Sequence, residues 1–409
     1  MHDLLVIGGG PAGATCARRA AQKGLDVVLI EKAIHPREKT CGGVLSPKAV
    51  HLLDFDVSHL FEREFHAALV HTPAGRRTLL TRDGLRGYLV QRSTFDDFLL
   101  KKAHEAGAEI VQGTKVVAIE QLRKGIRALC AGDSYRAHLL VGADGVNGIV
   151  GRELRIRSRW DPDSVAVCIK AEVEVDPSEI NRMCTPEEGH GRTALDFYYG
   201  LIEWGYGWCF PKRDTLDIGI GCRMDRARNL RDKWEVLISH VNRTKGLDLK
   251  VTAKTSARVP FGGIIGSYVA RRSMLIGDAA GLVSPVSGEG ISYAIESGTI
   301  AADVAFEAVR NRSAARIVEY EHRLGQGLLR ELKELRWLAR ILYRSNKNIE
   351  LICAIVDEDS VMRESLTDLL ARAKSQSDLL RQIRKRMLLR YPLKTIRLGL
   401  QQSGQSRAV

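Results

Sequence analysis

The sequence predicts an α/β fold in three parts: a parallel-sheet domain, a β-rich domain inserted into it, and a C-terminal helical region. An apolar run at 4–7 leads through a glycine-rich turn into a helical segment and a second apolar run at 27–30, as in a βαβ unit. Residues 165–254 alternate as strands do, and the residues after 315 have helical spacing. The first part is therefore predicted to be a Rossmann-type domain.

The glycine-rich turn has the spacing of a dinucleotide-binding fingerprint, G-x-G-x-x-G. It consists of Gly8, Gly9, Gly10, Pro11, Ala12 and Gly13. Gly8 permits a tight turn, Gly10 lets the backbone approach a pyrophosphate, and Gly13 lets the following helix pack closely on the sheet. Glu31 ends the second strand, where it can accept hydrogen bonds from the hydroxyls of an adenosine ribose. The combination predicts dinucleotide binding rather than a glycine turn of some other α/β protein.

Changes of character along the chain predict the domain boundaries. The Rossmann-type domain is expected at 1–160, with an antiparallel strand insertion near 67–90, and again at 259–315. The β-rich domain is expected at 161–258, and a helical region with a basic tail at 316–409.

Two helices and one apolar stripe are predicted individually. Ser93–Ala106 has helical spacing with Ser93 as the expected N-cap, and Ile291–Arg310 is Ala-rich and helical. After residue 315 leucines recur at helical spacing, at Leu324, Leu328, Leu332, Leu335, Leu338 and Leu342.

The composition limits the classes of protein and of site. The 409 residues include eight cysteines without a C-x-x-C pair, which argues against zinc, an iron–sulfur cluster or a redox dithiol. No metal site is therefore expected. Charges or glycines interrupt every apolar run, and the N-terminus leads directly into a strand, so we expect neither a membrane span nor a signal peptide. The expected location is the cytoplasm, either free or peripheral to a membrane.

The net charge of +13 is concentrated in part near the C-terminus. Seven cations are interleaved with leucines and isoleucines: Arg381, Arg384, Lys385, Arg386, Arg390, Lys394 and Arg397. This Arg381–Arg397 segment is typical of peripheral contact with an anionic membrane, or of the solvated face of a terminal helix or a basic tail. No recognition motif supports binding of nucleic acid.

The order of four motifs resembles the flavoprotein hydroxylase superfamily, which binds FAD in an extended pose. These motifs are the glycine turn, Arg92-x-x-Phe95-Asp96, Gly142-Ala143-Asp144-Gly145 and Gly277-Asp278-Ala279-Ala280-Gly281. Three further stretches resemble the geranylgeranyl reductase branch: Cys41-Gly42-Gly43, Tyr206-Gly-Trp208-Cys-Phe210-Pro211-Lys212, and Val286-Ser-Gly288-Glu-Gly290. The superfamily resemblance covers about 1–310, and no motif covers the residues after about 320.

The resemblance implies FAD as the cofactor and a set of residues that bind it. Arg92 is expected near the pyrophosphate or ribityl chain, and Asp278 at a ribityl hydroxyl. Val117 would offer backbone groups to the adenine, and Asp144 would support the cofactor from behind or serve the turn alone. The full implied set is Gly8, Gly10, Pro11, Ala12, Gly13, Glu31, Lys32, Cys41, Gly42, Arg92, Val117, Asp144, Asp278, Gly288, Gly290 and Ile291.

The resemblance also implies an aromatic wall against a prenyl chain, formed by Tyr206, Trp208, Phe210 and Pro211. Ordinary sheet core is the alternative for Trp208 and Phe210. Cys41 would face the flavin and take part in gating or proton delivery, or would be an inert packing residue. Cys41, Tyr206 and Trp208 are therefore the catalytic candidates. The family pattern often has a proline where this chain has Glu203, which bears on the shape of the loop.

The implied reaction saturates C=C bonds of a geranylgeranyl chain carried by a lipid, a diphosphate or a related isoprenoid. No second dinucleotide fold is visible, so the external electron donor is NADPH, ferredoxin or a deazaflavin. The alternatives are a flavin-dependent monooxygenase or halogenase of the same superfamily, and a non-catalytic membrane-associated flavoprotein.

Overall fold

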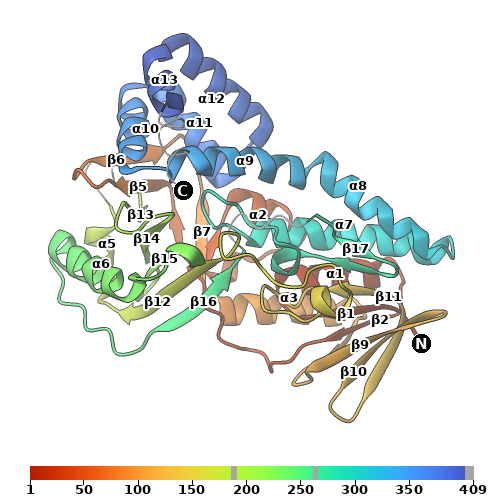
Figure 1. Cartoon of the computed structure of the whole chain (residues 1–409). Coiled ribbons are helices and arrows are strands. Elements are labelled where there is room, and N and C mark those ends of the chain that lie inside the picture. Colours follow the sequence, from red (N-terminus) through yellow and green to blue (C-terminus); the bar gives the residue numbers. More distant parts are fainter. Residues whose placement is uncertain (186–190, 261–265, 401–409) are drawn as a thin grey trace.

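The computed structural model describes residues 1–185, 191–260 and 266–400. Two sheets lie side by side, and the C-terminal helices cross over both of them (Figure 1). The flavoprotein-like sheet and its helices form the right-hand part of that view, and the β-rich part lies at the lower left.

The first sheet is mostly parallel, as the βαβ pattern predicts. Among the described residues it has eight strands, in the order β17-β18-β11-β1-β2-β8, with β10 paired to β11 and β9 paired to β10. Its strands are β1 (His2–Ile7), β2 (Val27–Ile30), β8 (Glu109–Val111), β9 (Val116–Leu122), β10 (Gly125–Cys130), β11 (Ser134–Gly142), β17 (Val269–Ala270) and β18 (Ser273–Leu275). The carboxyl ends of β1, β2 and β11 meet at one edge, where ligands bind in such sheets.

Three helices cover this sheet: α1 (Pro11–Gln22), α3 (Arg92–Glu105) and α7 (Ile291–Arg310). The bounds of α7 are those that the sequence predicts. The helix predicted at Ser93–Ala106 is confirmed as α3, but Ser93 as its N-cap is wrong. Gln91 is the N-cap, because its carbonyl already accepts the N–H of Phe95 at 2.9 Å, so the helix begins one residue earlier.

The second sheet has seven strands among the described residues, in the order β16-β12-β15-β14-β13-β5-β6. Its strands are β5 (Ala67–His71), β6 (Arg77–Thr81), β12 (Ala166–Glu174), β13 (Ala194–Tyr199), β14 (Gly205–Pro211), β15 (Thr215–Arg223) and β16 (Thr255–Val259). Helices α5 (Pro177–Met183) and α6 (Leu230–Lys245) pack on one face. β5 and β6 come from the stretch assigned to a strand insertion in the first domain, and here they extend the β-rich sheet through the β5–β13 pairing.

A small three-stranded sheet of β3 (Val44–Leu45), β4 (Phe61–Phe65) and β7 (Gly87–Val90) lies between the two parts, together with the short helix α2 (Pro47–His51). The loop that begins after β2 leads into this small sheet and so continues toward the β-rich sheet. The short helix α4 (Val150–Glu153) packs on the core of the first sheet.

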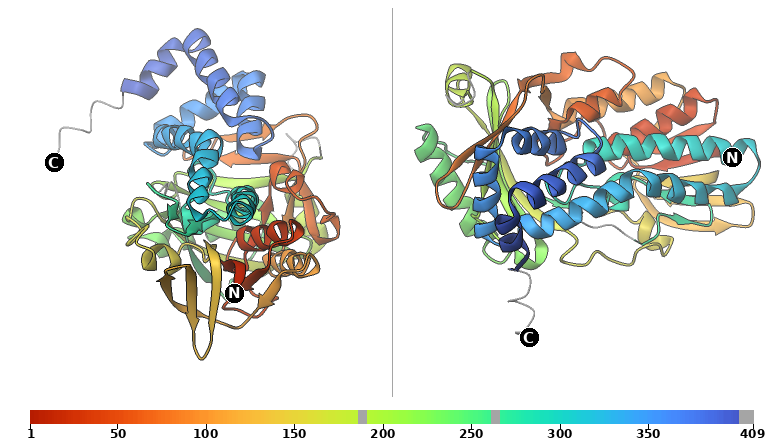
Figure 2. Two further views of the ribbon diagram at one scale, coloured as in Figure 1. Left: turned by 90° about the vertical axis from the view of Figure 1, so that its right-hand side faces the viewer. Right: turned by 90° about the horizontal axis from the view of Figure 1, so that it is seen from above.

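Between residues 318 and 400, six α-helices follow α7: α8 (Val318–Gln326), α9 (Leu328–Leu342), α10 (Asn346–Glu358), α11 (Ser360–Ala371), α12 (Gln376–Arg390) and α13 (Pro392–Leu400). The predicted leucine stripe runs along α8 and α9. Leu328 and Leu332 pack on the core of the first sheet, whereas Leu335, Leu338 and Leu342 pack on the β-rich part. Helix α9 thus joins the two parts. Figure 2 shows α12 and α13 projecting at the top of the molecule.

No helix among residues 1–185, 191–260 and 266–400 has both the length and the apolarity needed to cross a membrane.

Candidate functional site

The glycine turn fits a ligand that approaches the backbone closely. Gly8 has φ +109°, and a Cβ there would overlap the carbonyl of Ala143 at the end of β11. A Cβ on Gly13 would overlap the carbonyl of Gly8, so α1 packs against the turn as predicted. Gly10 differs, because the nearest atom to its Cβ position is Arg37 Nη2 at 3.8 Å. The space in front of Gly10 belongs to a large cavity.

Glu31 is buried at the end of β2 and lines the same cavity. Its carboxylate accepts the N–H of Gly9 at 2.5 Å and the N–H of Ala33 at 2.9 Å. These two bonds fix the carboxylate at the rim of the glycine turn and leave further lone pairs for ribose hydroxyls.

Two arginines face the cavity beside the turn. The guanidinium of Arg92 makes two bonds of 2.8 Å to the carboxylate of Asp96, one turn later in α3. Arg37 places Nη2 at 3.1 Å from the same carboxylate, while its buried Nη1 has no hydrogen-bond partner among the described residues. A buried, unpaired guanidinium nitrogen next to Gly10 suits a diphosphate. The sequence analysis missed Arg37, because no motif marks it.

Cys41 lies in the loop between the turn and the β-rich sheet. Burial raises the pKa of its thiol, but the guanidinium of Arg92, the ammonium of Lys39 and the N–H of Gly43 outweigh this and lower the pKa overall. A Cβ on Gly42 would come within 2.9 Å of the Phe210 ring. The Cys-Gly-Gly sequence therefore lets this loop lie directly against the aromatic side chains of β14.

The aromatic side chains of β14 point to one face of the strand and line the cavity, as period-two alternation requires. The centroids of the Tyr206 and Trp208 rings are 6.1 Å apart, and those of Trp208 and Phe210 6.2 Å. The hydroxyl of Tyr206 donates to the carbonyl of Ser287. Pro211 ends β14 and is not among the residues lining the cavity in the described part of the chain.

A cluster of four charged side chains supports this wall from behind. The indole N–H of Trp208 donates to Asp217 at 2.7 Å, and the other carboxylate oxygen of Asp217 accepts from Lys170. Lys170 also donates to the carbonyl of Cys41 at 3.0 Å, so this ammonium connects Cys41, through Asp217, with Trp208. Glu172 accepts from Lys170 at 2.8 Å and from Lys212 at 2.5 Å. No spacing pattern in the sequence marks this cluster, because its members lie on β12, on β15 and in the turn between β14 and β15, and 47 residues separate Lys170 from Asp217.

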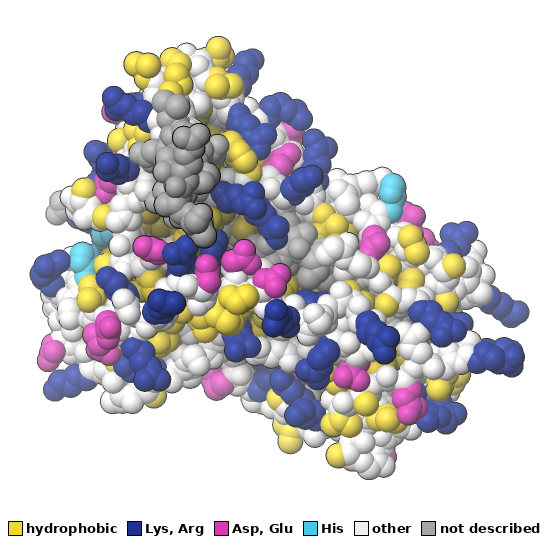
Figure 3. All heavy atoms as spheres, viewed as in Figure 1, with side chains coloured by type: hydrophobic (Ala, Val, Ile, Leu, Met, Phe, Trp, Pro, Cys, Tyr) yellow, Lys and Arg dark blue, Asp and Glu magenta, His cyan; other side chains and the backbone are white. Residues whose placement is uncertain are grey.

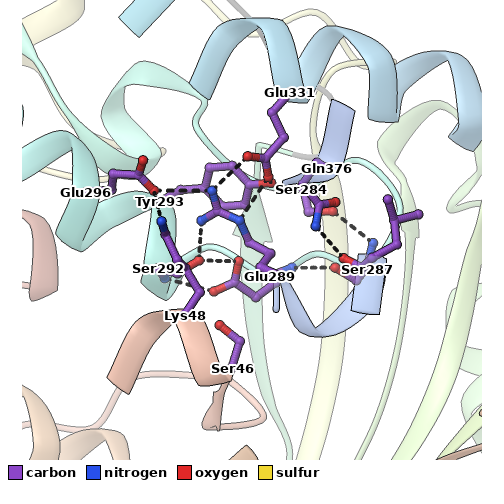
Figure 4. Close-up of polar contacts among 12 residues, drawn as sticks. Ser46, Lys48, Ser284, Ser287, Glu289, Ser292, Tyr293, Glu296, Glu331 and Gln376 are labelled. Atoms are coloured by element: carbon purple, nitrogen blue, oxygen red, sulfur yellow. Dashed lines mark hydrogen bonds and ion pairs between the residues drawn. The ribbon is translucent and has the colours of Figure 1, made fainter. Parts of the chain in front are cut away.

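The loop before α7 is held by a second polar network (Figure 4). Glu289 accepts the N–H and the hydroxyl of Ser292, both at 2.8 Å, and burial raises the pKa of its carboxyl. Arg372, which follows α11, donates to Ser292 at 2.5 Å and to Glu331 of α9 at 2.9 Å, and it lies 3.7 Å from the centroid of the Tyr293 ring. The C-terminal helices are thereby fastened to the loop that carries Gly288 and Gly290.

The remaining predicted cofactor residues occupy different positions. Lys32, Asp278, Gly288, Gly290 and Ile291 line the cavity. Asp144 also lines it, with one carboxylate oxygen bonded to the N–H of Val150 at 2.9 Å and the other without a partner among the described residues.

Val117 differs from these residues. Its side chain is exposed, and the cavity is bordered there by Thr114, Lys115 and Val116. Gly13 lies behind the turn rather than at the cavity surface.

The cavity is continuous and measures about 680 Å³. It runs from the glycine turn past Cys41 and the aromatic wall into an apolar chamber. Helices α9, α10 and α11 and strands β5 and β6 form the far wall through Val70, Leu80, Leu338, Leu342, Ile349, Ile352, Cys353, Val356, Leu366 and Leu370. Within the described ranges, no group of three His, Cys, Asp or Glu side chains could hold a metal ion.

A family model described as an FAD binding domain matches residues 1–324. The chain is 30% identical over 325 residues to digeranylgeranylglycerophospholipid reductase of Methanosarcina acetivorans, covering 76% of each protein. It is 31% identical over 318 residues to menaquinone reductase of Mycobacterium tuberculosis, covering 74% of this chain and 76% of that one. The chain belongs to the geranylgeranyl reductase family of FAD-dependent oxidoreductases. FAD is the cofactor of this reductase-family chain.

One relative extends through the C-terminal helices. Geranylgeranyl diphosphate reductase of Rhodobacter capsulatus is 29% identical over 413 residues, covering 97% of this chain and 95% of that one. The fold of the family member described here matches a geranylgeranyl bacteriochlorophyll reductase-like protein from Thermoplasma acidophilum, with TM-score 0.80, 24% identity and coverage of 94% and 98%. A flavin-dependent brominase has the same fold, with TM-score 0.73, 20% identity and the same coverage.

The residues at the turn fit FAD. The open space at Gly10, the fixed Glu31 carboxylate and the unpaired Arg37 nitrogen provide room for a diphosphate, a site for ribose and a positive charge.

Proposed function

We propose that this protein saturates isolated C=C bonds of a geranylgeranyl chain. In this proposal the prenyl chain of the substrate lies in the far apolar chamber, and its head group lies on the flavin side of the cavity or outside the cavity. The observation that carries the proposal is the continuity of the cavity between the glycine turn and the apolar wall of α9, α10 and α11. A prenyl chain needs an elongated apolar surface, and a reducing centre needs to be open to one part of it.

In this proposal Gly10, Arg37 and Glu31 bind the cofactor, and Gly288 and Gly290 let the backbone approach it. Reduced FAD supplies a hydride when bound. The aromatic wall of Tyr206, Trp208 and Phe210 excludes water and orients the alkene, since an unactivated double bond offers no polar handle.

Reduction of a C=C bond adds a hydride to one carbon and a proton to the other. We assign Cys41 as the donor of that proton. Its thiol lines the cavity between the glycine turn and the aromatic wall, and its lowered pKa makes it a stronger acid than an ordinary cysteine. Arg92 and Lys39 would stabilise the thiolate that remains after proton transfer. Lys170 and Asp217 would hold the Cys41 backbone and the Trp208 indole at a fixed separation, as positioning residues.

The relatives differ in the compound that carries the prenyl chain: one is named for a phospholipid, one for menaquinone and one for a diphosphate. We therefore propose the prenyl chain as the recognised feature. The electron donor is proposed to be an external one, NADPH, ferredoxin or a deazaflavin, that docks transiently on the basic surface.

The test is a single turnover without oxygen. The purified holoprotein is reduced with dithionite and mixed with geranylgeranyl diphosphate or a geranylgeranylated glycerol lipid, and the flavin absorbance and the mass of the lipid are followed. We expect flavin reoxidation together with a gain of two hydrogen atoms for each bond reduced.

Two outcomes would contradict the proposal. Flavin that stays reduced with every prenyl compound but reoxidises productively with O₂ and an aromatic substrate would indicate a monooxygenase or halogenase. Tightly bound FAD without reoxidation by either route would indicate a flavoprotein without turnover.

A further inference from the structure

The corner between α12 and α13 exposes large apolar side chains. Leu388 and Leu389 at the end of α12 are 63% and 73% exposed, and Leu393 and Ile396 of α13 are 74% and 50% exposed. We call these four side chains the apolar corner. Figure 3 shows hydrophobic side chains at the top of the molecule, where Figure 1 places α12 and α13, with Lys and Arg beside them. Single exposed leucines need no explanation, but four large apolar side chains exposed on one projecting corner do.

The corner is held rigidly by its inner side. Pro392 begins α13 directly after Tyr391, which ends α12. The buried Asp359, between α10 and α11, accepts Arg386 Nε at 2.6 Å and the hydroxyl of Tyr391 at 3.1 Å. Ile383 packs on Ile355 and Met362. The exposed leucines therefore point outward because the other faces of both helices are already occupied.

Cations surround the apolar corner. Arg386 pairs with Asp359, Lys394 with Glu358 at 2.8 Å and Arg381 with Asp378 at 3.2 Å. Among the described residues, Arg384, Lys385 and Arg397 have no carboxylate within ion-pair distance. Arg384 lies over the ring of the partly exposed Trp337, 4.5 Å from its centroid.

We propose that the α12–α13 corner is a docking surface for an anionic phospholipid membrane. Exposed leucines enter the boundary between headgroups and acyl chains, and neighbouring lysines and arginines bind anionic headgroups. Nucleic acid would bind the cations through its phosphates but would leave most of the exposed apolar surface in water, whereas the interface of an anionic membrane accommodates both.

The location of the corner gives docking a consequence. One face of α10 lines the chamber through Ile352, Cys353 and Val356, while Leu351 and Ile355 on the other side pack toward α12. Helix α10 thus lies between the proposed prenyl chamber and α12, and the outward side chains of α12 and α13 form the docking surface. On the proposed function, a membrane-borne substrate would travel only a short distance.

Vesicle binding tests the proposal without any turnover, so its failure is distinct from failure of the reductase proposal. The full chain is sedimented with vesicles of phosphatidylcholine and with vesicles in which about a third of the lipid is phosphatidylglycerol. Two double variants are compared with the wild type: L388S/L389S, and R384Q/K385Q. Their matched controls are V236S/V318S, at exposed valines far from the corner in the chain, and R86Q/R213Q, at exposed arginines.

We expect binding to the anionic vesicles that weakens with salt. Both corner variants should reduce the partition coefficient by about tenfold or more. For R384Q/K385Q the reason is that each surface cation contributes about 1 kcal/mol, a factor of about five. For L388S/L389S the reason is the loss of apolar surface that would enter the membrane interface. The controls should bind as the wild type does, and all variants should keep the same melting temperature.

Three results would overturn the proposal: wild-type protein that ignores anionic vesicles, corner variants that bind equally well, or a dimer that L388S/L389S abolishes. The last result would assign the corner to a second copy of this chain.

Discussion

The two ends of the cavity are built in different ways. At the flavin end, residues of short glycine-containing sequence segments, such as 7–12 and 286–291, line the cavity. At the far end, single side chains from β5, β6, α9, α10 and α11 form the wall. The first arrangement specifies one polar ligand closely, whereas the second specifies only an apolar volume.

This difference means that substitutions are more restricted at the flavin end than at the far end. A Cβ at the turn either overlaps backbone or enters the ligand space, so few substitutions are compatible with FAD. A wall of leucines and isoleucines tolerates exchange of one aliphatic side chain for another. The relatives are named for compounds with different head groups, which on the proposed function lie outside the far chamber.

The largest effect is expected where the two ends are joined. Arg372→Gln leaves Glu331 without its cation inside the protein and removes the nearer of the two cations beside Glu296, the other being Lys48 at 4.0 Å. Breaking such a buried pair costs about 3–5 kcal/mol. The melting temperature of Arg372→Gln should therefore be much lower than that of the wild type, whereas Arg381→Gln, at an exposed position, should leave the melting temperature unchanged. An unchanged Arg372→Gln protein would mean that the C-terminal helices are fastened independently of the flavin loop.

At the flavin end, Gly10→Ala should weaken FAD binding without unfolding the protein. The added Cβ meets no protein atom closer than 3.8 Å but enters the ligand space. We expect about a hundredfold higher Kd for FAD, about 3 kcal/mol, measured by flavin fluorescence on the apoprotein. Gly325→Ala, in the open on α8, is the matched control. Equal Kd values for both variants would contradict the assignment of the turn.

The support behind the aromatic wall should make stability pH-dependent. Burial would raise the pKa of Glu172, but Lys170 and Lys212 outweigh it and lower the pKa from 4.5 to about 2. The contribution is therefore complete above the unfolded-state pKa and is lost as the pH falls from about 5 to 2.

Because Glu172 is partly exposed, Glu172→Gln should cost about 1 kcal/mol at pH 7. The difference in melting temperature from the wild type should shrink toward acid pH. Glu174→Gln, two residues along β12, serves as the control. A difference independent of pH would show that charge at Glu172 does not support the wall.

Cys41 should be the most reactive thiol of the chain. Its pKa is lowered, whereas burial raises the pKa of each other cysteine, namely Cys16, Cys130, Cys168, Cys184, Cys209, Cys222 and Cys353. Iodoacetamide at pH 7 should label Cys41 at least about tenfold faster than the others, as peptide mass spectrometry would show. Faster labelling of any other cysteine would contradict its place as the acidic thiol.

The flavin end was predictable because its signals are local. The turn, Glu31 and the bounds of α7 follow from neighbouring residues in the sequence, although the cofactor roles assigned to single residues stay predictions. Arg37 and the Lys170–Asp217 pair could not be predicted from the sequence, because a cation in a loop and an ion pair across strands leave no spacing pattern. The far wall could not be predicted either, because its elements come together only in the folded chain: β5 pairs with β13 across more than a hundred residues of sequence.

Two adjacent residues of α10 can show whether the flavin end and the far end share one cavity. Ile352 lines the chamber, whereas Leu351 packs toward α12. Single-turnover reoxidation of the reduced flavin is measured for Ile352→Phe and Leu351→Phe, with geranylgeranyl and geranyl diphosphate. Ile352→Phe should slow only the longer substrate, by about fivefold, or about 1 kcal/mol, and Leu351→Phe should slow neither. Equal rates of both variants with the longer substrate would contradict a shared cavity.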